Sequence, residues 1–377
     1  MKKLNTILPQ PIYEYKENYY LRLGQPEFFN KFSKYFNIHI FGKVVKVNQI
    51  NSDTHIRLEE NITPHDFFKE ITLTHVLSNF KYYKKLILHD CDIQNDLFFL
   101  FYPYYKVSVV FAFMLRKTKL AIWFKSDYVA RFTLQKDSLK RILAYLLKPF
   151  VYVSYTLITR YILKDNLVFY SGDILYNKNN HINQHAIISC SDFNNNPDIL
   201  SNERSKKIIF VGNESEYKGL IYLLKALDKI ENPPKLTIVG IDKLERYKKY
   251  SHLNIECVGE IRERKIFYKT LAEHDCLIMP SRQETQGKVQ LEAMSVGVVP
   301  ICSDSGGTHN TIQNFYNGLL FKERSIDDLV DKINHIYRDK DFYSVLQING
   351  LNYMKVITLD RQVGMMKDTI INHHRYN

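Results

Sequence analysis

Residues 276–297 read CLIMPSRQETQGKVQLEAMSVG, and this stretch combines an apolar strand, a polar loop and a helix. Cys276–Pro280 is an apolar run of strand length, whereas Lys288–Val296 has helical periodicity. Two acids, Glu284 and Glu292, are separated by seven residues, one in the loop and one on the helix. Because a helix rises ~1.5 Å per residue, Glu292 lies about 6 Å, roughly one turn, beyond the start of the helix at Lys288. The two acids therefore bracket the start of one helix.

The start of such a helix suits a pyrophosphate, because its unpaired N–H groups and the positive end of its dipole attract anions. Gly287 would let the backbone approach the phosphates closely. One carboxylate can accept both hydrogen bonds of a ribose diol, and the other can hold sugar hydroxyls. As a bare spacing, two acids eight positions apart are common and are more often solvated surface groups.

From Ser205 onward, short β-type runs alternate with longer helical runs. This order predicts a parallel, doubly wound sheet. In such sheets ligands bind beyond the carboxyl ends of the strands, where Gly212, Gly240, Gly259 and the turn after Met279 fall. The expected strands are Lys207–Gly212, Lys235–Gly240, Asn254–Gly259, Cys276–Pro280 and Val298–Ser303, and the expected helices are Lys218–Ile230, Ile241–Tyr250, Arg262–His274 and Lys288–Val296.

The first half repeats this alternation less regularly, and the polar stretch Cys190–Ser205 has the composition of a linker. We therefore expect an N-terminal domain over 1–190, a linker over 191–205, a C-terminal domain over 206–358, and a closing helix with a tail over 359–377. The expected strands of the first half are Leu4–Leu8, Ile38–Phe41, Leu86–His89, Leu120–Phe124, Leu167–Tyr170 and Ala186–Ser189, and the expected helices are Pro26–Tyr35, Asp96–Leu115, Lys136–Leu163 and Pro64–Ser78.

The composition excludes wholesale disorder and a disulfide-stapled miniprotein, since 377 residues with 45% hydrophobic content can bury ample core. The N-terminus lacks the apolar region and the cleavage site of a signal peptide. No CxxC pair is present, which favours reduced thiols and a cytoplasmic protein. The five cysteines are Cys91, Cys190, Cys257, Cys276 and Cys302.

The basic charge is concentrated in the first half. Residues 1–200 carry 26 Lys and Arg against 17 Asp and Glu, whereas residues 201–377 carry 26 against 23. A nucleic-acid groove, an anionic membrane, an anionic substrate or a plain Lys-rich surface would each explain this excess. Leu97–Leu115 and Ile142–Leu163 are apolar but carry central charges, so neither is expected to span a bilayer. The second could lie on an anionic leaflet or pack in a core.

The run from Pro280 to Gly297 resembles the hallmark of the family-4 retaining glycosyltransferases of the GT-B fold, the glycosyl transferases group 1. The resemblance covers nearly all of residues 205–340, whereas the N-terminal half matches only in outline. It implies an α/β protein with two Rossmann-like, doubly wound parallel-sheet domains that face each other across a cleft. The other matching segments are Phe210–Gly212, Lys218-Gly219, Thr237–Gly240, Val258–Glu260, Ser305–Gly307 and Asn317–Leu320.

The resemblance also implies roles for individual residues. In similar enzymes the acid at the position of Glu284 contacts the donor sugar near the reacting carbon, and the acid at Glu292 binds the nucleotide ribose. The lysine at Lys218 neutralises the diphosphate, which stabilises the leaving group electrostatically without protonating it. Backbone amides around Gly287, Lys288 and Val289 hold the phosphates, Gly212 and Asn213 lie beside them, and Gly259 to Ile261 lie against the base. Similar enzymes work without a divalent metal, so no cofactor is expected.

The sequence departs from the family pattern at several positions. Asn213 stands where the family usually has a phosphate-binding Arg, so Lys218 must do more, or Lys288 or Arg282 substitutes. Asn310 replaces a common Glu. In the first half, Lys125 in the segment that ends at Asp127 occupies the place of a frequent His, and Gly24 stands in for the usual Gly-Gly.

A second, weaker pattern is Asp90-Cys91-Asp92, which follows the expected strand that ends at His89. It matches the D-x-D metal motif of the other main glycosyltransferase fold, but such tripeptides arise easily by chance. We therefore expect no metal site, and we assign His89, Lys125 and Asp127 to the acceptor side. The stretch from Gly212 to Gly219 lacks the Gly-Lys-Ser/Thr of a P-loop, so an ATPase is not indicated.

The predicted function is transfer of a hexose, with retention, from a nucleoside-diphosphate sugar, most commonly uridine-linked, to a growing glycan or lipid-linked glycan of the cell envelope. The expected location is the cytoplasm, with peripheral contact to an anionic membrane and no nucleic-acid partner. Two alternatives remain open. One is a nucleotide-sugar epimerase on the same fold, and the other is a non-catalytic partner that binds a nucleotide sugar, which the change at Asn213 would favour.

Overall fold

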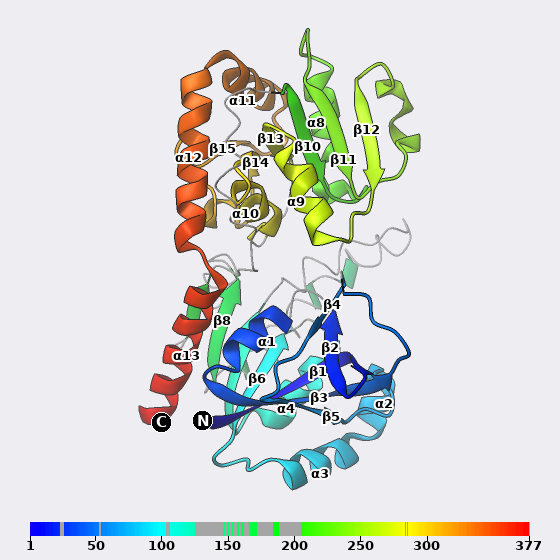
Figure 1. The fold of residues 1–377 in the computed structure, drawn as a ribbon, viewed down its shortest axis with the longest axis vertical. Helices are drawn as coiled ribbons and strands as arrows, with labels where there is room; N and C mark the ends of the chain where they lie inside the picture. The colour runs from blue at the N-terminus through cyan, green and yellow to red at the C-terminus, as the bar shows by residue number, and fades with distance from the viewer. Residues whose placement is uncertain are drawn as a thin grey trace. The chain divides into compact units, whose positions relative to one another are not determined.

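The computed structural model describes residues 1–22, 26–52, 54–102, 106–124, 166–171, 184–187, 205–282 and 286–376, with Glu284 and a few positions between 146 and 161. The chain forms two compact units, shown in Figure 1. The first unit comprises Met1–Ile187 and Leu359–Asn377, and the second comprises Ile188–Thr358. The C-terminal helix therefore belongs to the same unit as the N-terminus.

The first unit is built on a nine-stranded sheet in the order β4-β2-β1-β6-β7-β8-β9, with β3 also paired to β1 and β5 to β3. The pairs of β2 with β1 and with β4 are antiparallel, and all other pairs are parallel. The strands are β1 (Lys2–Tyr15), β2 (Asn18–Arg22), β3 (Phe36–Lys46), β4 (His55–Arg57), β5 (Ile62–Asp66), β6 (Leu97–Tyr102), β7 (Lys119–Phe124), β8 (Leu167–Ser171) and β9 (Gln184–Ile187).

The helices of the first unit pack on this sheet through apolar faces. The core beside α3 and α4 contains Tyr83, Ile87 and Phe111. A second group of aromatic side chains includes Phe28, which stacks on Phe99 with ring centres 5.6 Å apart. Next to α1 lies α13 (Figure 1). The helices are α1 (Pro26–Phe32), α2 (Leu73–Ser78), α3 (Phe80–Asp90), α4 (Lys106–Leu115) and α13 (Leu359–Tyr376).

Three of the elements expected in the first half are wrong. Leu86–His89 lies in helix α3 and is not a strand. The expected helix Asp96–Leu115 is strand β6 followed by helix α4, and Pro64–Ser78 holds the end of β5 and then α2. The physical reason is plain for β6, whose side chains from Leu97 to Phe101 are buried on both faces of the sheet, so that the strand shows no alternation of apolar and polar residues. The expected helix Lys136–Leu163 lies mostly outside the described residues.

The second unit holds a six-stranded, wholly parallel sheet in the order β12-β11-β10-β13-β14-β15. The five strands expected from the sequence are confirmed, and β15 is an addition. The expected helix Ile241–Tyr250 is only a 3₁₀ helix, η3 (Glu245–Tyr250). The strands are β10 (Lys207–Val211), β11 (Lys235–Val239), β12 (Ile255–Gly259), β13 (Cys276–Met279), β14 (Val299–Asp304) and β15 (Leu319–Lys322).

Helices cover both faces of this second sheet. Side chains of α8 and α11 enter one apolar cluster, and side chains of α9 and α10 enter another. The parallel, doubly wound arrangement predicted for residues 205 onward is therefore confirmed. The helices are η2 (Glu216–Lys218), α8 (Leu220–Leu227), η3, α9 (Arg264–Ala272), α10 (Lys288–Met294), η4 (Thr308–Asn310), α11 (Ile326–Arg338) and α12 (Lys340–Val356).

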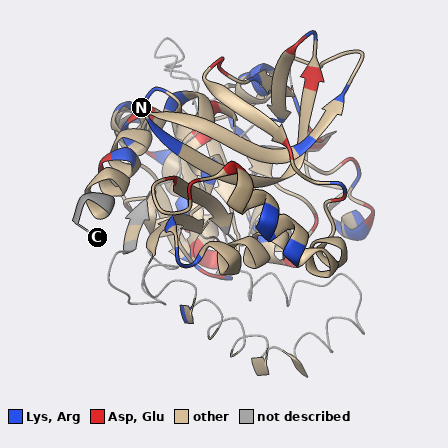
Figure 2. Cartoon of the chain, turned by 90° about the horizontal axis from the view of Figure 1, so that it is seen from below, with Lys and Arg blue, Asp and Glu red and all other residues tan. Residues whose placement is uncertain are grey.

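The apolar stretches and the charges have simple structural outcomes. Among the described residues, no helix combines the length and the apolar character needed to cross a bilayer. Leu97–Leu115 folds as β6 and α4, while Ile142–Leu163 is largely outside the described part. Basic and acidic residues are interspersed over the described elements (Figure 2). The described cysteines, Cys91, Cys257, Cys276 and Cys302, are free thiols, and Cys190 is not described.

Candidate functional site

Glycine turns meet at the carboxyl edge of the second sheet. Gly212 follows β10, Gly240 follows β11 and Gly259 ends β12. The N–H of Gly212 donates to the carbonyl of Val239 at 2.9 Å, and the N–H of Gly240 donates to the carbonyl of Gly259 at 2.6 Å. Gly240 has a φ of +96°, and a Cβ there would lie 2.8 Å from the Gly212 carbonyl oxygen. Three neighbouring strand ends therefore pack backbone to backbone.

Beside these turns, Lys218 and Glu284 form a close ion pair. The ammonium nitrogen lies 2.6 Å from Glu284 Oε1, and the two side chains are 20% and 13% exposed. Lys218 ends η2, where Gly219 turns the chain into α8 with a φ of +73°. The two residues are 66 positions apart, and a hydrogen bond from the Arg282 N–H to the Tyr217 carbonyl at 2.7 Å joins their loops. The fold thus brings together two residues predicted for the donor site.

The loop that carries Glu284 is fixed by the segment after β14. The N–H of Gly307 donates to the Glu284 carbonyl at 2.7 Å. Gly306 has a φ of +60°, and a Cβ there would overlap that same carbonyl oxygen. The Ser305 hydroxyl donates to the Ser281 carbonyl at 2.5 Å. The Ser-Gly-Gly sequence is therefore a clamp that fixes the backbone of the Glu284 loop.

Helix α10 begins directly after Gly287, whose φ is +81°. A Cβ at Gly287 would lie 2.6 Å from the side-chain nitrogen of Gln290, which is wholly buried. Gln290 accepts a hydrogen bond from the Thr311 hydroxyl, while its amide nitrogen has no partner in the part of the chain that the structure describes. A side chain at residue 287 would therefore collide with the buried Gln290, and the positive φ also favours glycine there.

Glu292, on the same helix, has a different environment from Glu284. It is half-buried, and no hydrogen bond or ion pair of its carboxylate is found within the described ranges. Burial raises the pKa of Glu292, while the charges of Lys288 and Arg264 act in the opposite direction. A desolvated carboxylate without a protein partner is suited to accept hydrogen bonds from a ligand.

The remaining donor-side candidates lie near this edge. The Asn213 side-chain oxygen accepts from the Ser215 N–H at 3.1 Å and from its hydroxyl, so Asn213 shapes the loop before η2. Val289 and Ile261 are half-buried against the apolar cluster under α9 and α10. Lys288 is the first residue of α10. These positions follow β10, β12 and β13 at the carboxyl edge of the sheet, and Val289 and Ile261 contribute packing.

The acceptor-side candidates fare differently. His89 does not end a strand, which corrects the prediction: it lies in the last turn of α3, 86% exposed, with its ring nitrogen 2.8 Å from Asp90 Oδ1. Asp90 and Asp92 precede β6, so they lie at the amino edge of the first sheet, opposite to the edge where ligands bind. Lys125, Asp127 and Gly24 lie outside the described residues.

Sequence reasoning missed how the site is held together. The clamp of Gly306 and Gly307 on Glu284 has a sequence signal, because paired glycines after a strand indicate a close backbone approach. The contact between Lys218 and Glu284 has no local signal, since it depends on which strands neighbour each other in the sheet.

Sequence comparison matches residues 192–352 to the family model described as glycosyl transferases group 1. An uncharacterized glycosyltransferase of Methanocaldococcus jannaschii is 30% identical over 179 residues, 45% of this chain and 49% of that protein. A glycogen synthase of Elusimicrobium minutum is 26% identical over 179 residues, 43% of this chain and 37% of that protein. The matched segment thus spans less than half the length of these curated relatives.

Solved structures match the fold over nearly the whole chain. A sucrose-phosphate synthase from Thermosynechococcus elongatus has a TM-score of 0.71 at 15% identity and covers 99% of this chain and 100% of its own. Anabaena HepE in complex with UDP-glucose has a TM-score of 0.65 at 13% identity and covers 98% of this chain and 100% of its own. At such identities the likeness concerns the fold alone, and it confirms the predicted α/β fold of the GT-B class.

Proposed function

Because residues 192–352 of this chain match the family model of the glycosyl transferases group 1, we propose that the protein is a glycosyltransferase that takes a sugar from a nucleoside diphosphate. The observation that carries this proposal is the Lys218–Glu284 pair, held at 2.6 Å beyond the carboxyl ends of parallel strands. Parallel sheets bind ligands at this edge. The pair joins a cation suited to phosphate with an acid suited to sugar hydroxyls.

In the proposed mechanism Lys218 changes partner when the donor binds. Its ammonium group moves from Glu284 to the diphosphate and stabilises the charge that develops as the sugar leaves. Glu284 is then free to accept hydrogen bonds from the sugar. Because the Ser281 and Gly307 contacts fix the backbone of the Glu284 loop, the acid stays in place when it loses the lysine.

The start of α10 would hold the nucleotide. We assign the backbone amides of Gly287, Lys288 and Val289 to the phosphates, and the carboxylate of Glu292 to the ribose diol. The segment from Gly259 to Ile261 would lie against the base. Asn213 offers no charge to the phosphates, so Lys218 would neutralise more of their charge or Lys288 would add a second cation.

The finer assignments are proposals that the descriptions of similar structures support. HepE has been solved with UDP and with UDP-glucose, which supports a uridine-linked hexose as donor. WaaG, another structural neighbour, is described as involved in lipopolysaccharide biosynthesis, which supports an envelope glycan as acceptor. We further propose that the anomeric configuration is retained and that no divalent metal is needed, so that a chelator leaves turnover unchanged.

Contact with the cytoplasmic face of an anionic membrane is proposed for the outer face of α3. Lys81, Lys84 and Lys85 are exposed there, together with Tyr82 at 44% and Leu88 at 52% exposure. Apolar side chains flanked by lysines are typical of interfacial helices. Sedimentation with phosphatidylglycerol vesicles should retain the wild type and release a variant with all three lysines changed to Gln, whereas equal binding would contradict the proposal.

The central test measures nucleoside diphosphate release from a panel of nucleotide sugars, with the wild type, Glu284→Ala and the exposed control Glu273→Ala. We expect Glu284→Ala to lower turnover by about 100-fold or more and the control to leave it unchanged. Undiminished turnover in Glu284→Ala would remove this acid from the mechanism. A changed sugar nucleotide formed without acceptor would indicate the epimerase.

Thermal unfolding with the same panel tests donor binding separately from chemistry. A bound donor raises the melting temperature by mass action. A shift without turnover would favour a non-catalytic binding partner, whereas no shift with any nucleotide sugar would contradict the proposed donor site.

A further inference from the structure

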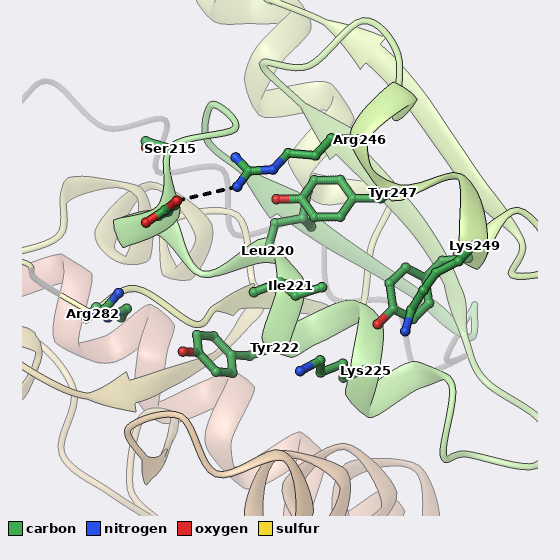
Figure 3. A pocket seen from close by; sticks show the side chains of 11 residues that line it. Ser215, Leu220, Ile221, Tyr222, Lys225, Arg246, Tyr247, Lys249 and Arg282 are labelled. Atoms are coloured by element: carbon green, nitrogen blue, oxygen red, sulfur yellow. Dashed lines mark hydrogen bonds and ion pairs between the residues drawn. The ribbon is translucent and has the colours of Figure 1, made fainter. Parts of the chain in front are cut away.

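A pocket of about 470 Å³, lined by both polar and apolar side chains, lies between η2, α8 and η3 of the second unit (Figure 3). Its volume falls within the range of small-molecule sites. It opens on the side of the sheet covered by α8, whereas α10 belongs to the apolar cluster on the other side. The two regions share a border, because Glu216 lies in η2 with Lys218, and Arg282 is two residues before Glu284.

Four cations line this pocket against a single acid. Lys225 and Lys249 are exposed, and neither has an ion-pair partner in the described part of the chain. Arg246 lies 3.4 Å from Glu216, the pair marked in Figure 3, and both side chains are 55% exposed. Among the described residues, the carboxylate within reach of Arg282 is that of Glu323, at 3.9 Å. The described lining of the pocket therefore carries more positive than negative charge.

Tyrosines form the rest of the polar lining. Tyr250 is 1% exposed, and its hydroxyl has no hydrogen-bond partner among the described residues. Lys249 lies over the Tyr250 ring, 4.7 Å from its centre. Tyr222 and Tyr247 are half-buried in the same lining (Figure 3). A buried hydroxyl without a partner calls for an explanation, and a hydroxyl-bearing ligand supplies one.

The cationic side chains and the tyrosines of the lining together indicate which chemical groups a ligand of this pocket carries. Aromatic rings with polar tips offer flat apolar faces to the C–H groups of a sugar and hydrogen bonds to its hydroxyls. Lysine and arginine side chains around one cavity bind phosphate or carboxylate. We propose that this pocket binds a sugar that carries a phosphate or carboxylate group, at a site separate from the Lys218–Glu284 pair.

The test is calorimetric titration of the full chain with glucose 6-phosphate and, in a second arm, with a glucuronate-containing tetrasaccharide. Glucose and inorganic phosphate serve as controls. Saturable binding of glucose 6-phosphate alone indicates that the ligand of the pocket is a free sugar phosphate. Saturable binding of the tetrasaccharide alone indicates that the ligand is a segment of an anionic glycan. Absence of saturable binding with both would overturn the proposal.

Variants locate the binding. Lys225→Gln with Lys249→Gln should weaken binding about tenfold, whereas Lys265→Gln, an exposed lysine on α9, should not. Glu216→Gln should strengthen binding about threefold, because it removes the acid that competes for Arg246. Lys218→Met should leave binding intact. If Lys218→Met lost binding while the Lys225 and Lys249 variant bound the probe as tightly as the wild type, the probe would lie at the donor site and the inference would be overturned.

Discussion

Each unit contains a lysine–carboxylate pair, and the two pairs lie at opposite edges of their sheets. Lys218 meets Glu284 beyond the carboxyl ends of β10 and β13. Lys3 meets Asp96 at 3.3 Å, where β1 and β6 begin. Asp96 also accepts from the Asn5 side chain at 3.0 Å and from the Asp92 N–H at 3.1 Å. The Lys3–Asp96 pair is thus part of a hydrogen-bonded network at the edge of the core. The Lys218–Glu284 pair instead lies beside the glycine turns that follow the strands.

The difference shows that residue types alone do not indicate a site. Parallel strands direct ligands to their carboxyl edge, so a polar cluster there is free to serve chemistry. At the amino edge, the Lys3–Asp96 cluster is held by contacts within the protein and contributes to stability. The comparison can be tested because Trp123 is the single tryptophan and is buried in the first unit, so its fluorescence follows the unfolding of that unit.

The largest effect is expected on turnover. Lys218→Met should lower nucleoside diphosphate release by about 100- to 1,000-fold, because the leaving group loses its cation. Lys3→Met should leave turnover per folded molecule unchanged and lower the free energy of unfolding of the first unit by about 1–2 kcal/mol. Release assays and urea unfolding followed by Trp123 fluorescence measure both. If Lys3→Met impaired turnover equally, the distinction between the two edges would fail.

The clamp on Glu284 should be the next most sensitive feature. Gly306→Ala places a Cβ against the Glu284 carbonyl at a φ of +60°. We therefore expect the free energy of unfolding to fall by about 3 kcal/mol, or the Glu284 loop to be displaced so that little turnover remains. The matched control is Gly364→Ala in α13, where a Cβ meets nothing within 4 Å. Because alanine favours a helix more than glycine does, this variant should raise the free energy of unfolding by about 0.5–1 kcal/mol. Circular dichroism melting compares the two variants, and normal stability and turnover in Gly306→Ala would contradict the clamp.

The amino-edge network should depend on its acid. Asp96→Ala removes the acceptor of the Asn5 and Asp92 hydrogen bonds and should lower the stability of the first unit by about 2 kcal/mol. Glu245→Ala breaks a solvent-exposed pair with Lys248 and should change stability by less than about 0.5 kcal/mol. Urea unfolding measures both variants, and similar changes would show that burial does not strengthen the network.

The smallest effect is a pH dependence of the first unit. His39 Nδ1 lies 2.8 Å from His65 Nε2, and burial lowers the pKa of both rings below 6.5, with Lys3 acting in the same direction. Asp96 raises the pKa of His39 and Asp90 that of His65, but these charges do not offset burial. The unfolded chain therefore takes up protons that the folded unit does not, and stability falls as the pH drops below about 6.5.

A variant with both histidines changed to Gln should show a flatter loss of stability between pH 7.5 and 5.5. The urea midpoint of Trp123 fluorescence at several pH values gives this slope, independently of any change in absolute stability. An unchanged slope would mean that other groups account for the pH dependence.

The sequence predicted the second unit well because its strands are short apolar runs separated by glycine turns and amphipathic helices. In the first unit the same kind of argument failed at Leu86–His89, where a short apolar run of α3 looks like a strand. It also failed at Leu97–Tyr102, where burial on both faces hides the alternation of a strand. Periodicity cannot separate these cases, because the neighbours in space decide them.

The site was predictable in parts. Glu284, Glu292 and Gly287 stand in one continuous motif, so their grouping follows from local sequence. The partner of Glu284, and the cations of the pocket beside α8, come from separate segments that only the order of strands brings together. The spacing of residues along the sequence does not predict contacts between segments that are far apart in the chain.

The return of α13 to the first unit has a consequence for synthesis. Val363, Met366 and Ile370 are buried in α13, so the first unit lacks part of its core until residues 359–376 leave the ribosome. The second unit is one continuous segment, Ile188–Thr358, and needs nothing that is translated later. We therefore expect the second unit to fold before the first, although its residues are translated later. Until α13 has been synthesised, the apolar surface of the first unit that α13 covers stays exposed and can bind chaperones.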